Sequence, residues 1–262
     1  MFDDYLTMVL TFLTGLGGGT YVGIASGTAE PFIIPLLTIV LGSTVYQAIG
    51  TSLAVDCVIG GVAGCIFLLK GRGVIKPVII LAISGVIFSV IGSFFSTGTP
   101  ESSLKWLIAI VLIFFGLVLI RGGTKRNIDY INKNLDLTWL KQHAQLSLVL
   151  FGSFIGFLSG FTGMGSSGAM TILLIFVMGF DLHTSIGTSL LMMFFIAAAG
   201  GISHGFQGNF VFQVAIIAGA GAGVGAGAGS LFANRVDEDK LGRVIGGIIV
   251  VLGIAFLIDV LL

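Results

Sequence analysis

Long stretches of this chain carry no charged side chain at all. None lies between Lys76 and Glu101, and none lies between Asp181 and Arg235. A helix needs about 20 apolar residues to cross a hydrocarbon core about 30 Å thick, and several of the uncharged stretches reach that length. Charged residues make up only 9% of the chain, whereas about 25% is usual in a soluble domain. The sequence therefore predicts an all-α polytopic membrane protein that has the lipid bilayer as its surroundings.

The few charges exclude other classes of protein. The formal net charge is zero, so no basic surface for nucleic acid is expected. Asp3 and Asp4 precede the first apolar segment, where a signal peptide would carry basic residues. This segment is therefore interpreted as a span of the mature protein. No metal-binding or cofactor-binding motif is present in the sequence, and no metal and no cofactor is expected.

A six-residue sequence occurs twice in the chain. Residues 48–53 read AIGTSL and residues 185–190 read SIGTSL, an offset of 137 positions. The same offset, without a gap, pairs Gly19 with Gly156, Gly23 with Gly160, Gly42 with Gly179, Gly64 with Gly201, Gly71 with Gly208, Gly92 with Gly229, Glu101 with Glu238 and Gly116 with Gly253. An unbroken register of this length indicates two copies of one structural unit.

Apolar runs and their Gly, Pro and charged boundaries predict five segments in each copy. The first repeat, residues 1–121, has segments at about 5–24, 27–41, 43–69, 74–96 and 103–121. Residues 122–141 form a linker, and the second repeat, residues 142–262, has segments at about 142–161, 164–179, 180–205, 211–233 and 240–258. The second segment of each repeat is short, so it is expected to be a tilted span or a broken helix.

The positions of Lys and Arg predict how the repeats are oriented. Three groups lie between segments: Lys70, Arg72 and Lys76; Arg121, Lys125, Arg126, Lys133 and Lys141; and Arg235, Lys240 and Arg243. Basic loops face the cytoplasm. All three groups fall on that side if each repeat crosses five times, whereas the third lands outside if the short segments do not cross. We therefore expect two inverted-topology repeats in the cell membrane, with a cytoplasmic linker and both termini extracytoplasmic.

Glycine clusters with serine and threonine just before the short segment of each repeat. Residues 15–30 read GLGGGTYVGIASGTAE, and residues 152–168 read GSFIGFLSGFTGMGSSG. Inverted repeats are common in secondary transporters, whose substrate sites lie near the midplane where interrupted helices meet. Helix starts at such a place present free N–H groups and a positive dipole end, which favour an anion. The alternative is that these glycines only allow close helix packing.

The candidate substrate-binding residues are Ser26, Gly27, Thr28, Thr51, Ser52, Gly163, Gly165, Ser166, Ser167, Thr188 and Ser189. For the repeated Thr-Ser pairs of the third segments, a bond from the hydroxyl to its own helix is the alternative. Glu30 and Asp56 are expected within the membrane, where ionisable groups are costly and often functional, and they are candidates for proton coupling. The repeat counterpart of Asp56 is Met193, so such coupling would belong to one repeat; a structural role for both acids is the alternative.

Several features follow one another in the first repeat: a glycine-rich opening, Pro35-Leu36-Leu37, AIGTSL at 48–53 and a basic turn. The second repeat has the same order, and in this combination the chain resembles the TauE/SafE sulfite exporter family over nearly its whole length. The resemblance implies a bacterial or archaeal plasma-membrane permease that exports sulfite or an organosulfonate such as sulfoacetate. The chain departs from the family pattern after Gly23 and at Ile172, the counterpart of Pro35.

Two other functions fit parts of the sequence. An anion channel also uses broken helices and neutral dipoles. Residues 165–168 read GSSG, which fits the turn of a serine nucleophile, so an intramembrane serine hydrolase with Ser167 as nucleophile and His204 as base is the second alternative. The expectation is a transporter and not an enzyme, with a small anion and a coupling proton as its partners. The sequence predicts no particular oligomeric state.

Overall fold

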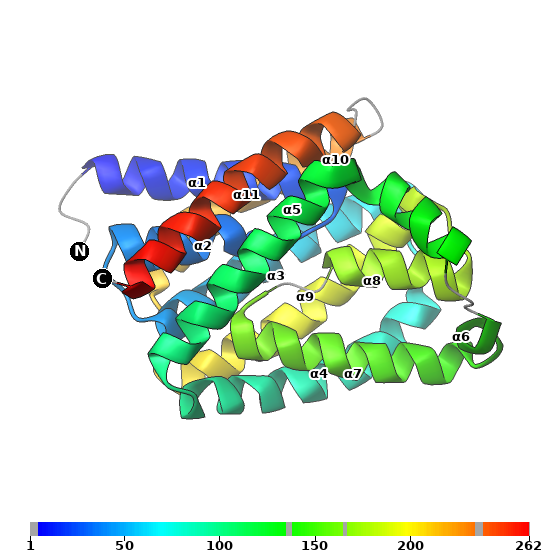
Figure 1. Ribbon diagram of the computed structural model, residues 1–262, viewed down its shortest axis with the longest axis horizontal. Helices are drawn as coiled ribbons and strands as arrows, with labels where there is room; N and C mark the ends of the chain where they lie inside the picture. The colour runs from blue at the N-terminus through cyan, green and yellow to red at the C-terminus, as the bar shows by residue number, and fades with distance from the viewer. Residues whose placement is uncertain (1–4, 135–137, 165–166, 234–237, 262) are drawn as a thin grey trace.

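Long helices run roughly along the longest axis of the molecule (Figure 1). The computed structural model describes residues 5–134, 138–164, 167–233 and 238–261. In these ranges, eight helices are long and apolar enough to cross a membrane. They are α1 (Tyr5–Ala25), α3 (Val45–Leu69), α4 (Ile75–Gly98), α5 (Glu101–Asn134), α7 (Ala144–Thr162), α9 (Leu182–Phe206), α10 (Phe212–Phe232) and α11 (Glu238–Leu261). A polytopic all-α fold is confirmed, and α5 continues into the region that was expected to be a linker.

Two shorter helices interrupt this series, one in each repeat. The first is α2 (Glu30–Pro35), which continues as the π-helical turn η1 (Leu36–Val40). The second is α8 (Ser167–Leu173), which continues as η2 (Leu174–Met178). Both start about three residues after the expected segment boundaries, at Glu30 and Ser167. In the first repeat Pro31 explains the later start, because proline suits the first turn of a helix and not its interior.

The residues that meet between helices show in which direction the chain runs. The pairs are Gly15 with Ala218, Gly23 with Ala226, Val58 with Gly219, and Lys70 with Ser230. Positions rise together in each pair, so α1 and α3 both run parallel to α10. Because α1 and α3 cross in the same direction, residues 26–44, which contain α2 and η1, bring the chain back between them.

The second repeat follows the same path. Here the pairs are Gly85 with Gly156, Gly92 with Phe161, Gly85 with Ile196, and Ser93 with Ser203. They make α7 and α9 both parallel to α4, so α8 and η2 return the chain between α7 and α9. Two other pairs of helices run antiparallel: α3 with α9, and α5 with α11. Their contacts are Leu53 with Gly200, Gly64 with Leu191, Ile113 with Gly253, and Lys105 with Asp259.

Contacts between the repeats come in matched pairs. The Val211 N–H donates to Thr51 Oγ1 at 2.9 Å, and at the positions 137 residues away the Val74 N–H donates to Thr188 Oγ1 at 3.1 Å. Close helix packing is matched in the same way. A Cβ on Gly19 would lie 2.2 Å from the Ala222 carbonyl oxygen, and a Cβ on Gly156 would lie 2.3 Å from that of Gly85. Each repeat therefore contacts the other through equivalent backbone positions, and glycine is needed at these approaches.

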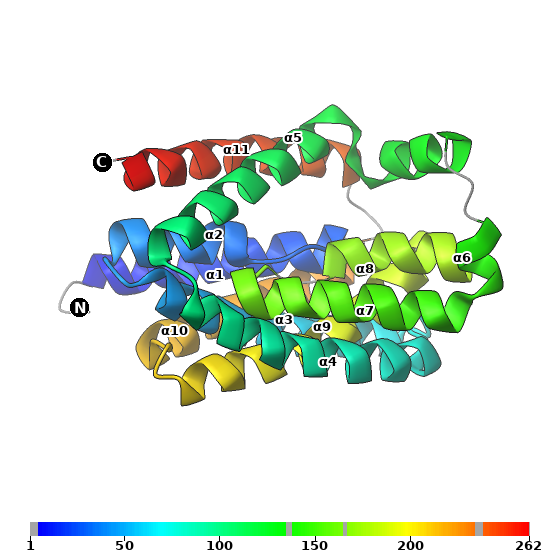
Figure 2. The same ribbon diagram turned by 60° about the horizontal axis from the view of Figure 1, so that its bottom comes forward.

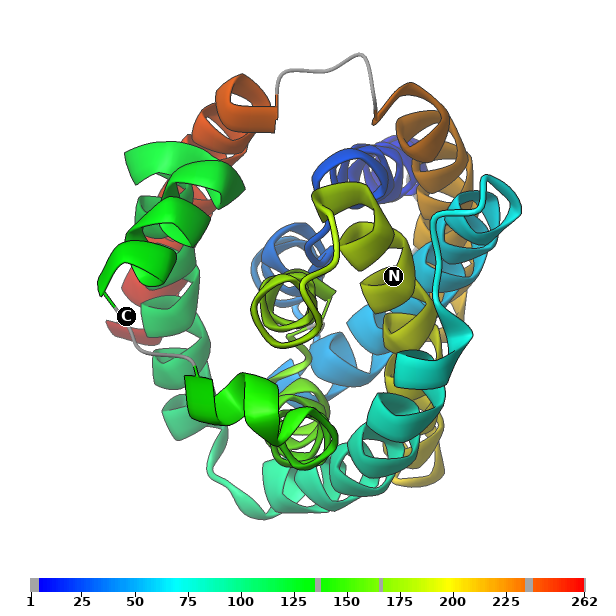
Figure 3. The same ribbon diagram turned by 90° about the vertical axis from the view of Figure 1, so that its right-hand side faces the viewer.

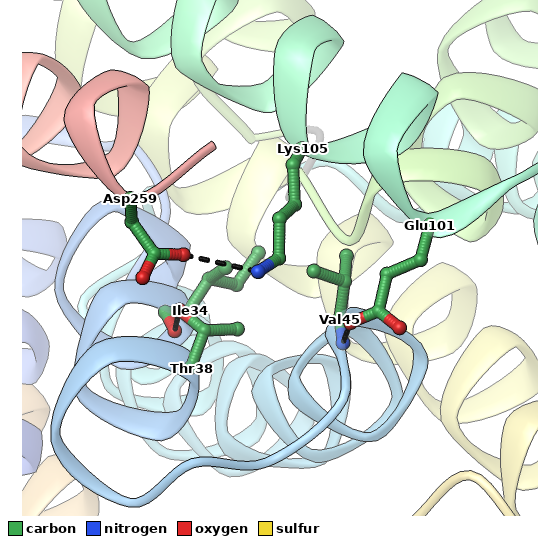
Figure 4. Close-up of polar contacts among 6 residues, drawn as sticks. All are labelled: Ile34, Thr38, Val45, Glu101, Lys105 and Asp259. Carbon is green, nitrogen blue, oxygen red and sulfur yellow. Dashed lines mark hydrogen bonds and ion pairs between the residues drawn. The ribbon is translucent and has the colours of Figure 1, made fainter. Parts of the chain in front are cut away.

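Helices α5 and α11 lie together along one side of the molecule (Figure 3). An ion pair joins them at one end, where Lys105 Nζ lies 3.0 Å from Asp259 Oδ2 (Figure 4). Beside it, Glu101 Oε1 accepts a hydrogen bond from the first N–H of α3, that of Val45 (2.9 Å). The repeat counterparts of Lys105 and Asp259 are Gly242 and Gly122. This ion pair therefore has no equivalent at the other end of the two helices.

Candidate functional site

The starts of α2 and α8 meet inside the molecule. The two short helices lie in opposite halves of the molecule along its long axis, with α2 on the left and α8 on the right (Figure 1 and Figure 2). The Gly27 N–H donates to Ser167 Oγ at 3.0 Å, and the Ser167 hydroxyl in turn donates to the Gly27 carbonyl oxygen. Segments that lie 140 residues apart in the chain are thus joined where both short helices begin.

A buried cluster of hydroxyl groups surrounds this meeting point. Ser26 Oγ lies 2.9 Å from Thr171 Oγ1 and 3.3 Å from both Ser167 Oγ and Ser189 Oγ. Thr171 and Ser189 are themselves 2.7 Å apart. All four side chains are buried, and they come from the end of α1, from α8 and from α9. Hydroxyls can both donate and accept, so this cluster offers neutral hydrogen bonds to a polar ligand without a buried cation.

The backbone at Ser26 has an unusual conformation. Its φ is +57°. Among the described residues, Ser26 is the only residue other than glycine that has a positive φ. Such conformations cost free energy in L-residues and often occur at functional sites. The repeat counterpart, Gly163, has φ +78°, where glycine pays no such cost. The chain therefore makes the same turn in both repeats, and in the first it keeps a hydroxyl there.

Asp56 lies at the start of α2. Its Oδ1 accepts from the Ala29 N–H at 3.0 Å, and its Oδ2 accepts from Thr28 Oγ1 at 2.9 Å. The Glu30 side chain interacts with the same carboxyl group, and both acids have no exposed surface. A carboxylate of the protein thus occupies the place at which a helix start attracts an anion. At α8 the residues equivalent to Glu30 and Asp56 are Ser167 and Met193, so the acidic pair belongs to α2.

The other predicted site residues lie at different places in the structure, and not all of them belong to the hydroxyl cluster. Thr51 and Thr188 lie outside the cluster and bond to the backbone N–H groups just before α10 and α4. The Ser52 hydroxyl donates to the carbonyl of Ile49 in its own helix (2.9 Å), and the residue packs against Gly163. Thr28 lies at Asp56, next to the cluster. Gly165 and Ser166 fall outside the described residues.

Thr171 is a site residue that sequence reasoning missed. Its repeat counterpart is Ile34, so the internal repeat carries no signal for it. Tyr21 is a second residue that sequence reasoning missed. Its ring packs closely on Gly27, since a Cβ on Gly27 would lie 3.0 Å from the Tyr21 hydroxyl oxygen. The signal available for Thr171 was helical spacing, since it lies four residues after Ser167 and its hydroxyl donates to the Ser167 carbonyl (2.9 Å).

The contacts of Ser167 and His204 bear on the hydrolase alternative. His204 is fully buried, and its Nε2 bonds to the Gly160 carbonyl oxygen at 2.9 Å. The Ser167 hydroxyl bonds instead to Ser26 and Gly27. Within the described part of the chain no hydrogen bond joins Ser167 to His204, although a general base must reach the group that it deprotonates.

Comparison with known proteins agrees with this architecture. The family model described as "Sulfite exporter TauE/SafE" matches residues 69–256. The chain is also 28% identical over 221 residues to the "Probable membrane transporter protein YdhB" of Bacillus subtilis (strain 168), a match that covers 82% of this chain and 84% of that protein. No solved structure matches the chain. The matched region includes five of the eight long helices, most of α11, and the short helix α8, and the chain belongs to the sulfite exporter TauE/SafE family of membrane transporters.

Proposed function

We propose that this protein is a secondary transporter of a small anion, sulfite or an organosulfonate such as sulfoacetate, and that the anion binds where α2 and α8 begin. The observation that carries the proposal is the contact of Gly27 with Ser167 inside the cluster of buried hydroxyls. Neutral donors at helix starts favour an anion without a buried Lys or Arg. The name of the family, sulfite exporter, supports sulfite as substrate and export as direction.

Alternating access is the proposed mechanism, with the two halves as inverted repeats. Two observations support it. The equivalent helices α3 and α9 run antiparallel, and so do α5 and α11. Contacts between the halves also recur when the roles of the halves are exchanged, as with Thr51 to Val211 and Thr188 to Val74. Two similar halves of opposite direction can exchange outward-open and inward-open shapes about a fixed central site.

The proposed location is the plasma membrane, with the linker in the cytoplasm and the termini outside. The Lys70 ammonium donates to the Ser230 carbonyl at the end of α10 (3.0 Å). This contact supports placing the basic α3–α4 turn on the same side as the end of α10, which Arg235 follows in the sequence. Cytoplasmic loops are enriched in Lys and Arg, and this side would then be the cytoplasmic one.

Counterflow in proteoliposomes tests the proposal. Purified protein should accumulate labelled sulfite or sulfoacetate against unlabelled internal anion, with saturation. Ser26→Ala and Ser167→Ala should each weaken apparent affinity about tenfold, the usual effect of one lost hydrogen bond to a charged group. Thr51→Val, outside the cluster, is the matched control. Conductance that does not saturate would favour the channel, and unchanged affinity in both serine variants would remove these side chains from the site.

A further inference from the structure

We propose that His204 is a proton-binding site that regulates the anion site: a proton on its Nδ1 releases the end of α7 and weakens binding of the anion beside Ser167. The proposal rests on the proposed function. It adds regulation by pH and assigns it to one side chain of the second repeat.

The His204 side chain lies in a buried slot between α3 and α7. A Cβ on Gly50 of α3 would lie only 2.7 Å from the His204 Cβ, so the two helices are in close contact here. The ring reaches across to α7, where Nε2 bonds to the Gly160 carbonyl oxygen at 2.9 Å. The side chain has no exposed surface. His204 thus joins the last turn of α9 to both α3 and α7.

The equivalent slot in the first repeat holds a phenylalanine. Phe67 is the counterpart of His204, and Gly187 is the counterpart of Gly50. A Cβ on Gly187 would lie 2.6 Å from the Phe67 Cβ, so the two slots have the same construction. Phe67 is also buried. An apolar ring therefore fills this slot, and packing alone does not require the two ring nitrogens that His204 brings to it.

The bond to Gly160 caps the end of α7. Gly160 lies in the last turn of this helix, which ends at Thr162, and carbonyl groups there lack partners within the helix. The chain then turns at Gly163, with φ +78°, and α8 begins at Ser167. His204 is therefore a positioning residue for the anion site, because it holds the end of the helix that leads to the start of α8.

The two ring nitrogens of His204 have different surroundings. A carbonyl oxygen only accepts, so Nε2 carries the hydrogen of the bond to Gly160, and the neutral ring keeps a lone pair on Nδ1. Nδ1 is buried, and within the described part of the chain no group bonds to it. A proton taken up there forms an N–H bond and makes Nδ1 a second donor on a charged ring. Because a buried donor without an acceptor is costly, proton uptake opposes the packing of α7 on His204.

Other charges near the slot do not reverse this effect. The titratable groups on α9 and on the elements packed against it are Tyr46, Asp56, Cys57 and Cys65 on α3, Lys76 on α4, and His183 on α9 itself, whereas the sequences of α7, α8 and η2 contain none. Asp56 lies about 9 Å farther along α3 than Gly50 and bonds to Ala29. Tyr46, one turn before Gly50, donates to the Thr99 carbonyl at 2.7 Å. The ends of α7 and α9 attract a cation, yet this attraction is smaller than the cost of enclosing an ionised group away from water.

Proton and anion therefore oppose each other. The packed arrangement, in which His204 holds α7 and Ser167 meets Gly27, favours the anion and the neutral ring. When the end of α7 is released, water reaches the ring, which then binds a proton in the pH range in which histidine ordinarily titrates. Since coupling is reciprocal, a bound anion weakens proton binding to His204 by the same factor as the proton weakens anion binding.

The test uses full-length protein in proteoliposomes with the same pH on both sides. Methanesulfonate is the probe, because a sulfonate stays ionised at about pH 5.5 and at about pH 7.5, the two values that bracket the ordinary titration of histidine. Saturable counterflow measures apparent affinity, and we expect wild-type affinity to be at least about threefold lower at the acidic pH. His204→Gln keeps an N–H donor for the Gly160 carbonyl but does not titrate. Its affinity should resemble that of wild type at the higher pH and vary less than about twofold between the two.

His204→Phe, which supplies the side chain of the equivalent slot, is a second variant in case His204→Gln fails to fold. It loses both the cap and the titrating group, so it should bind the anion more weakly at both pH values and without pH dependence. His143→Gln replaces an exposed histidine just before α7 and is the control, which should keep the wild-type pH dependence.

Two results would overturn the regulation and leave the transporter intact. One is equal wild-type affinity at both pH values, and the other is wild-type pH dependence in folded His204→Gln or His204→Phe. Absence of any saturable counterflow of methanesulfonate, sulfite or sulfoacetate would overturn the proposed function, and the regulation with it.

Discussion

The starts of α2 and α8 occupy equivalent places in the two repeats, yet only one of them is acidic. At α2 the Asp56 carboxyl accepts the Ala29 N–H and Glu30 lies beside it. At α8 the equivalent positions hold Ser167 and Met193. Away from this centre the repeats are closely alike, as the contacts of Thr51 and Thr188 show. The repeat therefore preserves the contacts that hold the halves together, whereas the side chains at the centre differ between the two halves.

The largest expected effect tests the part in which the repeats agree. Gly19→Ala and Gly156→Ala should each lower the free energy of unfolding by about 3 kcal/mol. The reason is the same at both positions, because an added methyl would lie 2.2 Å and 2.3 Å from a carbonyl oxygen of the facing helix and force the helices apart. Unfolding in detergent, followed by circular dichroism, measures the change.

Gly17→Ala is the matched control on α1, because no atom lies within 4 Å of an added Cβ there. It should leave stability unchanged or raise it slightly, since alanine favours helix over glycine. If Gly19→Ala were as stable as Gly17→Ala, close packing of α1 on α10 would not be what keeps glycine at this position. A large difference between Gly19→Ala and Gly156→Ala would show that the repeats do not share this interface.

The second prediction concerns the turn at which Ser26 and Gly163 correspond. Ser26→Gly should weaken anion affinity about tenfold, because a donor of the cluster is lost. Its stability should not fall, since glycine adopts φ +57° without the cost that serine bears. Gly163→Ala should instead be destabilised by about 1–2 kcal/mol, because alanine is strained at φ +78°. Counterflow and thermal unfolding of both variants separate the two roles, and a loss of stability in Ser26→Gly would contradict the assignment of strain.

Sequence reasoning located part of this centre for a physical reason. Gly, Ser and Thr just before a short apolar segment predict a broken helix, and recurrence at a fixed offset indicates that two such breaks meet. Ser26, Gly27, Ser167 and Ser189 do come together. Thr171 could not be found in this way, because its counterpart is Ile34 and its place in the cluster depends on how α8 packs on α9.

The acids and the threonines show the other limit of sequence reasoning. Spacing places Asp56 on the same helix face as Ser52, but it does not show that the start of α2 lies beside that face. This depends on the crossing of helices that are distant in the chain. Thr51 is a candidate substrate-binding residue on the same sequence grounds as Ser52, yet its hydroxyl accepts the Val211 N–H of a loop 160 residues away. Local patterns thus predict helices and their breaks, whereas partners across the repeats depend on packing.

The third prediction is that Thr51→Val and Thr188→Val have equal effects on stability and leave anion affinity unchanged. Each variant leaves one backbone N–H, that of Val211 or of Val74, without its hydroxyl acceptor. We expect each to lose about 1 kcal/mol of stability and to bind the anion as wild type does, because both hydroxyls lie outside the cluster. Chemical unfolding and counterflow measure the two quantities. Weakened anion affinity in either variant would place its threonine in the substrate path.

The smallest effect concerns the equivalent caps Thr44 and Asp181, which accept hydrogen bonds at the starts of α3 and α9. The hydrogen bond from the Thr184 side chain holds the pKa of Asp181 below its ordinary value of 3.8, with the Thr184 N–H adding to it. A carboxyl whose folded-state pKa is lowered stabilises the fold when the pH is above the ordinary pKa. This stabilisation is lost as pH falls through the folded-state pKa.

The free energy of unfolding of Asp181→Asn should therefore depend less on pH in the acid range than that of wild type. At neutral pH the substitution should change the free energy of unfolding by only about a few tenths of a kcal/mol, because asparagine is also a good cap. Thr44→Asn should keep the wild-type acid dependence, because threonine does not titrate. Urea unfolding from about pH 6 downward compares the two variants, and the same acid dependence in both would show that the Asp181 carboxylate contributes nothing beyond an ordinary cap.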